Sequence, residues 1–85
     1  MKKFDYVIKD ELGIHARPAG MLAKTAKAYS SEIMISKGEK SAGATKLMAL
    51  MGLGVKCGDT VAVTINGDDE EAAEKGMKEF FEANL

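Results

Sequence analysis

The residues best suited to chemistry lie close together near the start of the chain. The only histidine, the only arginine and the only proline are His15, Arg17 and Pro18, within four consecutive residues. A preceding glycine, Gly13, and a proline suited to a first helical turn predict that a helix begins here with His15 as its N-cap. The backbone N–H groups of Ala16 and Arg17 would then lie at the positive end of the helix dipole, where an anion can bind.

This grouping is typical of a histidine that accepts a phosphoryl group. A neutral imidazole can act as a nucleophile, and a guanidinium two residues later can bind phosphate oxygens through two parallel hydrogen bonds. The alternative is that His15 is only a capping or solvated residue and Arg17 only a surface charge, which is the commoner situation near a helix start. From the residues alone, either ring nitrogen of His15 could be the nucleophile.

The segment from Gly13 to Ala19, GIHARPA, resembles the active-site signature of HPr, the histidine-containing phosphocarrier of the bacterial phosphoenolpyruvate:sugar phosphotransferase system. The resemblance extends along the whole chain without obvious gaps and includes a second stretch, Leu47 to Gly54. It implies an open-faced β-sandwich and a phosphoryl group carried on Nδ1 of His15. It also implies transient binding to two partners, enzyme I as phosphoryl donor and enzyme IIA as acceptor.

Length and composition limit the class of protein. With 85 residues, of which 46% are hydrophobic, residues 1–85 can form one compact domain. A net charge of -1 argues against a broad nucleic-acid-binding surface. The single cysteine, Cys57, excludes an intramolecular disulfide and fits a reducing compartment, and no apolar run is long enough to cross a bilayer. We expect a cytoplasmic monomer without a metal or another cofactor.

In the first half of the chain, Phe4, Tyr6 and Ile8 alternate with neighbours that are polar except for Val7, and this period of two predicts a strand. A helical repeat then follows His15 and predicts an amphipathic helix that ends at Ser30 and Ser31. Its inward residues are Ala19, Leu22, Ala23, Ala26 and Tyr29. Strands are predicted over Glu32–Ser36 and Lys40–Gly43, joined by a hairpin turn at Gly38.

In the second half, a short helix is predicted from Ala44 or Thr45 to Leu53, with Leu47 and Leu50 turned inward and Gly52 and Gly54 ending it. Residues 56–59 predict a turn, and 60–65 a strand with three apolar residues on one face. Residues 66–69 predict a turn and N-cap for a last helix. Its buried residues are Ala73, Met77, Phe80 and Phe81, with Gly76 allowing close packing.

The predicted order is therefore βαββαβα. The apolar pattern favours an α+β fold in which a four-stranded, mainly antiparallel sheet is covered by three helices on one face. This arrangement agrees with the open-faced β-sandwich that the resemblance implies.

The outer face of the first predicted helix is a candidate surface for binding a partner protein. Arg17, Gly20, Met21, Lys24 and Lys27 share that face, and the short second helix adds Leu47, Met48 and Met51. Exposed lysines often serve only solubility, and methionines at helical spacing are commonly core residues. The resemblance instead implies that the two helices form one shared docking surface, for which flexible methionines and a local positive charge are suited.

Three other functions are alternatives to a carrier that has no turnover of its own. A small phosphohydrolase would need a group that activates water, and Asp10, Glu11 and Asp69 are the unplaced carboxylates that could be considered. A regulatory adaptor would not require His15. A phosphocarrier of the nitrogen branch would use identical chemistry with other partners, and nothing in the sequence separates the two branches.

One position departs from a pattern common in the family. In many of its members the residue that opens the second short helix is a serine phosphorylated by an ATP-dependent kinase, and the gap-free match places Lys46 there, after Thr45. Lysine has no hydroxyl group, and the hydroxyl of Thr45 would point about 100° away around the helix axis. The sequence therefore predicts a carrier that lacks this phosphorylation switch.

Overall fold

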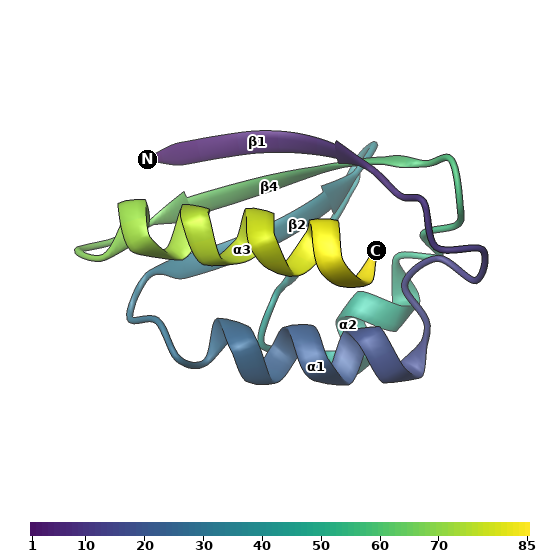
Figure 1. The fold of residues 1–85 in the computed structure, drawn as a ribbon, viewed down its shortest axis with the longest axis horizontal. Coiled ribbons are helices and arrows are strands. Elements are labelled where there is room, and N and C mark those ends of the chain that lie inside the picture. The colour runs from purple at the N-terminus through teal and green to yellow at the C-terminus, as the bar shows by residue number, and fades with distance from the viewer.

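The computed structural model describes residues 1–85 as four strands and three helices around one core (Figure 1). The elements in chain order are β1 (Lys2–Val7), α1 (Ala16–Ala26), β2 (Glu32–Lys37), β3 (Lys40–Gly43), α2 (Leu47–Gly52), β4 (Thr60–Asn66) and α3 (Glu70–Asn84). The predicted order βαββαβα is confirmed. None of the three helices combines the length and the apolar character needed to cross a membrane.

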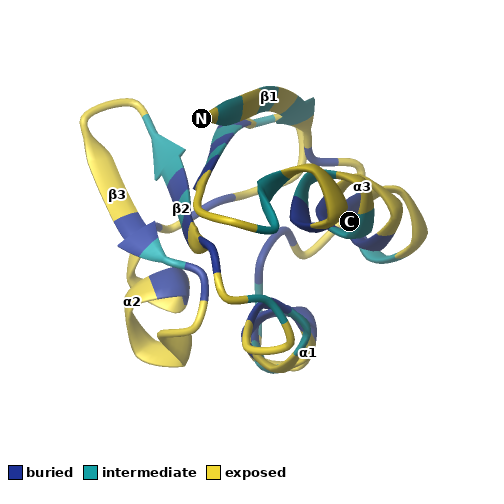
Figure 2. Cartoon of the chain, turned by 90° about the vertical axis from the view of Figure 1, so that its left-hand side faces the viewer, coloured by how far each residue is buried: buried dark blue, intermediate teal, exposed yellow.

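The strands form one sheet in the order β1-β4-β2-β3, and every neighbouring pair is antiparallel. Val63 at the centre of β4 pairs with Phe4 on one side and with Ile35 on the other. The helices cover a single face of this sheet, and the buried segments face one another in the space between them (Figure 2). The predicted open-faced α+β architecture is therefore confirmed.

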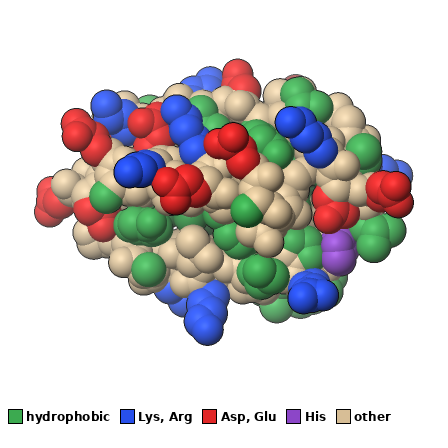
Figure 3. Space-filling model, viewed as in Figure 1, with side chains coloured by type: hydrophobic (Ala, Val, Ile, Leu, Met, Phe, Trp, Pro, Cys, Tyr) green, Lys and Arg blue, Asp and Glu red, His purple; other side chains and the backbone are tan.

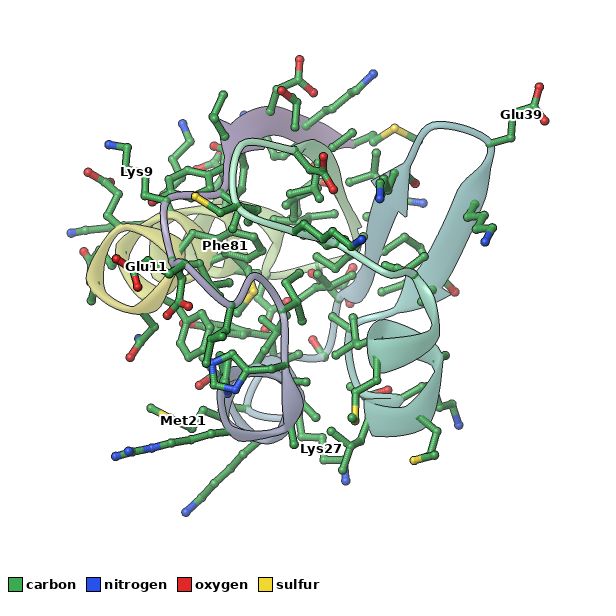
Figure 4. All side chains as sticks on the ribbon, turned by 90° about the vertical axis from the view of Figure 1, so that its right-hand side faces the viewer. Lys9, Glu11, Met21, Lys27, Glu39 and Phe81 are labelled. Carbon is green, nitrogen blue, oxygen red and sulfur yellow. The ribbon has the colours of Figure 1, made fainter.

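The core forms because strand and helix apolar periodicities point to the same layer. On β4, Val61, Val63 and Ile65 are fully buried and alternate with less buried residues, as a half-buried strand requires. Phe81 of α3 lies at the centre of the molecule (Figure 4), and its ring meets those of Phe4, Tyr6 and Phe80 edge to face. The aromatic cluster thereby fixes α3 against the edge strand β1.

The first helix ends earlier than its apolar pattern predicts. Regular helix stops at Ala26 rather than at Ser30 and Ser31. The amides of Ala28 and Tyr29 donate to carbonyls three residues back, which tightens the chain into a 3₁₀ turn. Tyr29 still packs against the core, and its hydroxyl occupies the space that a Cβ at Gly76 of α3 would need. Gly76 thus allows the close packing that the sequence predicts.

The second helix is also shorter than predicted, and one of its leucines points differently. Ala44 donates its N–H to the Ile33 carbonyl, so this part of the chain remains attached to β2 and the helix begins only at Leu47. Leu50 is buried as predicted, but Leu47 is 40% exposed, and Leu53 is the second inward leucine. The prediction that Leu47 turns inward is therefore wrong.

Asp69 occupies the predicted N-cap position of α3, but its side chain does not cap that helix. The carboxylate instead accepts hydrogen bonds from the hydroxyl of Ser31 and from the N–H groups of Ser30 and Ser31. These donors, the Ser31 hydroxyl foremost, hold the pKa of Asp69 below its ordinary value of 3.8. Asp69 therefore joins the turn after α1 to the start of α3.

Candidate functional site

His15 is the N-cap of α1, as predicted, with extended backbone angles of φ -101° and ψ -175°. Its carbonyl accepts the N–H of Ala19 at 2.9 Å, which closes the first helical turn. The imidazole makes no capping hydrogen bond and is about one-third exposed. In Figure 3 it is the only histidine and lies at the surface, at one end of the molecule. The ring is therefore accessible to a partner.

The start of α1 offers unpaired backbone donors. The N–H groups of Ala16 and Arg17 reach no acceptor within the chain, because they precede the first helical hydrogen bond, which runs from the Ala19 N–H to the His15 carbonyl. The first turn also contains no acidic residue that could neutralise the positive end of the helix dipole. This helix end is consequently suited to an anion such as a phosphoryl group.

The loop before His15 is fixed by contact with the loop after α2. Gly13 adopts φ +69°, and a Cβ at this position would lie 2.1 Å from the Val55 carbonyl oxygen. The same oxygen accepts the N–H of Ile14 at 3.2 Å. Glycine is required at position 13 for both the left-handed backbone and the close approach, so the orientation of His15 depends on the second loop.

That second loop is held by an ion pair. The Lys37 ammonium at the end of β2 lies 2.9 Å from the Asp59 carboxylate and donates to the Gly54 carbonyl at 2.9 Å. Asp59 also accepts the N–H of Lys56 at 2.8 Å. The hydrogen bond from Lys37, followed by that from Lys56, lowers the pKa of Asp59. The loop therefore rests on the β2–β3 hairpin while it supports Gly13 and Ile14.

Arg17 lines the same surface hollow as His15. The hollow has a volume of about 290 Å³. Its lining includes His15, Arg17, Pro18 and Met21, together with Asp10 from the loop and Asn84 from the end of α3. The Arg17 side chain is exposed and forms no ion pair, so its guanidinium remains available for an anion.

The polar lining residues Asp10 and Asn84 are not among the site residues predicted from the sequence. Asp10, which the sequence left unplaced, brings its Oδ1 to 3.8 Å from Nε2 of His15. Asn84 is brought to the hollow by the packing of α3, and its amide donates to the Phe80 carbonyl. An aspartate three residues before a glycine is a turn signal that could have drawn attention to Asp10. No local signal marks Asn84.

The predicted docking residues lie on α1 or at its C-cap, Lys27, and on α2, and the two helices pack beside one another. Met21 and Lys27 point outward from α1 (Figure 4), Lys24 is exposed, and Gly20 is partly exposed with open space at its α-carbon. On α2, Met48 is 77% exposed, and Met51 and Leu47 are also exposed. The docking surface, as we use the term, comprises Gly20, Met21, Lys24, Lys27, Leu47, Met48 and Met51. The structure thus brings all seven predicted residues to the protein surface on two adjacent helices.

Nothing near His15 resembles a metal site. The chain contains no group of three or more histidine, cysteine, aspartate or glutamate side chains arranged to hold a metal ion. The exposed thiol of Cys57 approaches only the Lys9 carbonyl, at 3.7 Å. The groups that meet at this site are an imidazole, two backbone amides and a guanidinium.

Known proteins share the sequence pattern and the fold of this chain. A family model described as "PTS HPr component phosphorylation site" matches residues 2–83. The phosphocarrier protein HPr of Mycoplasma genitalium is 41% identical over 85 residues, covering 99% of this chain and 97% of that protein. The crystal structure of HPr-C-His from Thermoanaerobacter tengcongensis superposes with a TM-score of 0.92 at 40% identity, covering 98% of this chain and 93% of that one.

A third relative shows the same unit within a larger protein. The multiphosphoryl transfer protein of Salmonella typhimurium is 37% identical over 84 residues, which cover 95% of this chain but 22% of that protein. Fold, site and relatives together define a small phosphoryl-group carrier. The chain belongs to the HPr family, the phosphocarriers of the phosphotransferase system.

Proposed function

We propose that His15 is the residue that carries the phosphoryl group, accepting it from enzyme I and passing it to enzyme IIA. This proposal rests on three features that occur together at the start of α1. The imidazole is accessible and makes no capping hydrogen bond, two backbone N–H groups have no acceptor, and the guanidinium forms no ion pair. Each group has a distinct task, because the imidazole attacks phosphorus while the amides of Ala16 and Arg17 and the guanidinium stabilise the phosphoryl oxygens.

The transfer needs no further reactant. A lone pair of the His15 ring forms a bond to phosphorus while the bond between phosphorus and the donor breaks, and the electron pair of that bond stays with the donor. Passage to the acceptor is the same exchange with the ring as leaving group. The hollow contains no second histidine, and its one carboxylate, Asp10, accepts the Leu12 N–H and lies beside Nε2 of His15 rather than free to activate water, so we propose a carrier without independent turnover.

We further propose that the docking surface binds the donor and the acceptor in turn. Its lysines, Lys24 and Lys27, form no ion pairs within the chain and can attract an acidic partner. Its methionines can adapt to two different partner surfaces. In this proposal residues 1–85 act as one monomeric domain in the cytoplasm, in transient contact with each partner.

Lys46 supports an additional proposal about regulation. It is the exposed N-cap of α2, adjacent to the docking surface, and it has no hydroxyl group to phosphorylate. A phosphoserine here would place close to two negative charges beside Met48, whereas Lys46 adds a positive one. The docking surface would then stay favourable to acidic partners at all times.

The test is incubation of the chain with phosphoenolpyruvate and a general enzyme I, followed by intact mass measurement before and after mild acid. We expect one phosphate per chain, lost in acid because phosphorus is bound to nitrogen, and located on His15 by peptide mapping. Absence of the phosphate, or an acid-stable phosphate on a hydroxyl group, would contradict the proposal.

A further inference from the structure

We propose that Asp10 is a positioning residue that selects the nucleophilic nitrogen of His15. Its carboxylate keeps the proton of the neutral ring on Nε2, so that Nδ1 carries the free lone pair that attacks phosphorus. The inference rests on the proposed function of His15 and goes beyond it, because the sequence provides no physical reason to prefer one ring nitrogen.

The first observation is a contact that involves only one side of the ring. Oδ1 of Asp10 lies 3.8 Å from Nε2 of His15, within the range of a charge contact, and both side chains line the same hollow. No other carboxylate pairs with His15. The negative charge is therefore on the Nε2 side, and Nδ1 is the nitrogen without such a neighbour.

The second observation is that Asp10 is itself firmly placed. Its N–H donates to the Leu85 carbonyl at 2.9 Å, and its own carbonyl accepts the N–H of Gly13 at 3.0 Å. Its Oδ1 accepts the N–H of Leu12 at 2.9 Å, which closes a turn through the side chain. The carboxylate thus has a defined position next to the ring before any partner arrives.

The electrostatic consequence follows from the two tautomers of a neutral imidazole. With the proton on Nε2, a positive N–H edge faces the carboxylate, whereas with the proton on Nδ1 a lone pair faces it and is repelled. A carboxylate that fixes the tautomer of a histidine through one ring nitrogen is a recurring arrangement at metal and catalytic sites. Here it leaves Nδ1 as the nucleophile.

The same contact stabilises the product. When the Nδ1 lone pair forms the bond to phosphorus, the donor keeps the electron pair of the broken bond and Nε2 keeps its proton, so the ring becomes positively charged. Asp10 is then opposite that charge, and Arg17 and the helix amides are available to the phosphoryl oxygens. Because Asp10 is on the Nε2 side of the ring, its negative charge is kept away from the incoming phosphate.

The experiment compares the wild type with Asp10→Asn and Asp10→Ser, which remove the charge but keep an oxygen that can accept the Leu12 N–H. Glu11→Gln is the matched control, because it removes a neighbouring negative charge that does not contact His15. Long-range ¹H–¹⁵N spectra recorded where the ring is neutral report the proton on each ring nitrogen. The spectrum contains one histidine, so its assignment is direct.

We expect the wild type and Glu11→Gln to show a protonated Nε2 and an unprotonated Nδ1. In both Asp10 variants the minor tautomer should increase about fivefold, the size of effect expected for one partly exposed charge contact. The rate of phosphoryl acceptance at saturating enzyme I should fall up to about fivefold, because the positive charge that develops on the ring loses its carboxylate partner, while KM stays unchanged because docking is not altered.

Three results would overturn the proposal. One is a tautomer ratio in the Asp10 variants equal to that of the wild type, and another is a transfer rate that rises when the carboxylate is removed. The third is wild-type phosphate on Nε2, which would leave the function of His15 standing while removing the role of Asp10. Because the spectra of the unphosphorylated ring do not depend on transfer, the two proposals fail separately.

Discussion

The starts of α1 and α3 are both helix N-termini, but they treat the positive end of the dipole in opposite ways. At α3, Glu70 and Glu71 lie in the first turn, and Glu70 accepts the Gly67 N–H and pairs with the N-terminal ammonium of Met1 at 3.1 Å. That ammonium is the main reason that the pKa of Glu70 is lowered. The start of α3 is therefore already neutralised by the chain itself.

At α1 the corresponding positions contain no acidic group. Ala16 and Arg17 follow the N-cap His15, whose side chain makes no capping hydrogen bond, and their N–H groups have no acceptor in the chain. Acidic residues in a first turn stabilise a helix by about 0.3–1 kcal/mol. The α1 start thus does without a stabilising interaction that α3 uses. The difference leaves the start of α1 free for an anion from outside, as the proposed function requires.

The largest effect on phosphoryl transfer is expected for His15→Ala, which removes the group that distinguishes the start of α1. We expect complete loss of acid-labile phosphorylation, because His15 is the only histidine. The free energy of unfolding should change by no more than about 1 kcal/mol, since the imidazole makes no capping bond. Intact mass and thermal melting measure the two effects. Retained acid-labile phosphate in the variant would exclude His15 as the carrier.

The comparison is tested more directly by giving α1 the acidic first turn of α3. Ala16→Glu should reduce the phosphoryl acceptance rate at least about tenfold, because a carboxylate would occupy the position of the phosphoryl oxygens, while helix stability stays equal or rises by about 0.3–1 kcal/mol. Ala72→Glu, at an exposed position in α3, is the control. Equal rates for the two variants would show that phosphate does not use the α1 start.

A conservative change sharpens the role of the guanidinium. Arg17→Lys keeps the charge but loses the planar pair of donors, so we expect transfer to slow about fivefold. Lys24→Arg makes the reverse exchange further along the same helix and should leave the chemical step unchanged. Rapid-quench measurement of transfer in both directions is suitable. If Arg17→Lys matched the wild type in both directions, Arg17 would be a surface charge only.

Charge reversal on the docking surface should have a smaller effect that depends on salt. We expect the Lys24→Glu, Lys27→Glu double variant to associate with enzyme I about threefold more slowly at low ionic strength, because exposed charges are screened within about 10 Å at 0.1 M salt. Reversal of Lys40 and Lys75, exposed lysines outside the docking surface, is the control. An association rate that is unaffected by the double reversal at any salt concentration would contradict a docking role.

Asp69→Asn should have the smallest effect on phosphoryl transfer. It should, however, change how the stability of the fold depends on pH. The folded-state pKa of Asp69 lies below 3.8, so as the pH falls the unfolded state takes up the proton first and stability decreases from about pH 3.8 downward. The variant should be less stable than the wild type at neutral pH, and this difference should shrink in acid. Melting curves against pH, with Asp68→Asn as control, measure it. A constant difference across the pH range would contradict the assignment.

Local signals in the sequence predicted the elements whose formation depends on neighbours in the chain. The alternating Val61, Val63 and Ile65 predicted a strand, and Gly13 with Pro18 predicted the helix that places His15. The predicted docking residues also reach the protein surface, including Leu47, whose helical periodicity wrongly predicted an inward side chain. These signals sufficed because a strand face and a helix start are set by residues only a few positions apart.

The features that the sequence did not predict depend on contacts between distant residues. The late start of α2 follows from the bond of Ala44 to Ile33, and the real partner of Asp69 is Ser31 rather than its own helix. Asp10 contacts His15 only because the turn between them folds back, and this contact is not visible in the sequence. No periodicity or motif in the sequence carries information about which distant groups will meet.

The contact between Gly13 and Val55 makes the reactive stretch dependent on the whole molecule. A short synthetic peptide with the sequence of residues 12–20 would contain the histidine, the arginine and the proline, but it would lack the carbonyl that receives the Ile14 N–H. Inserting these nine residues into another protein would therefore transfer the reactive side chains without the contacts that orient them. The orientation of these side chains requires the complete fold, in which the loop before α1 and the loop after α2 contact each other.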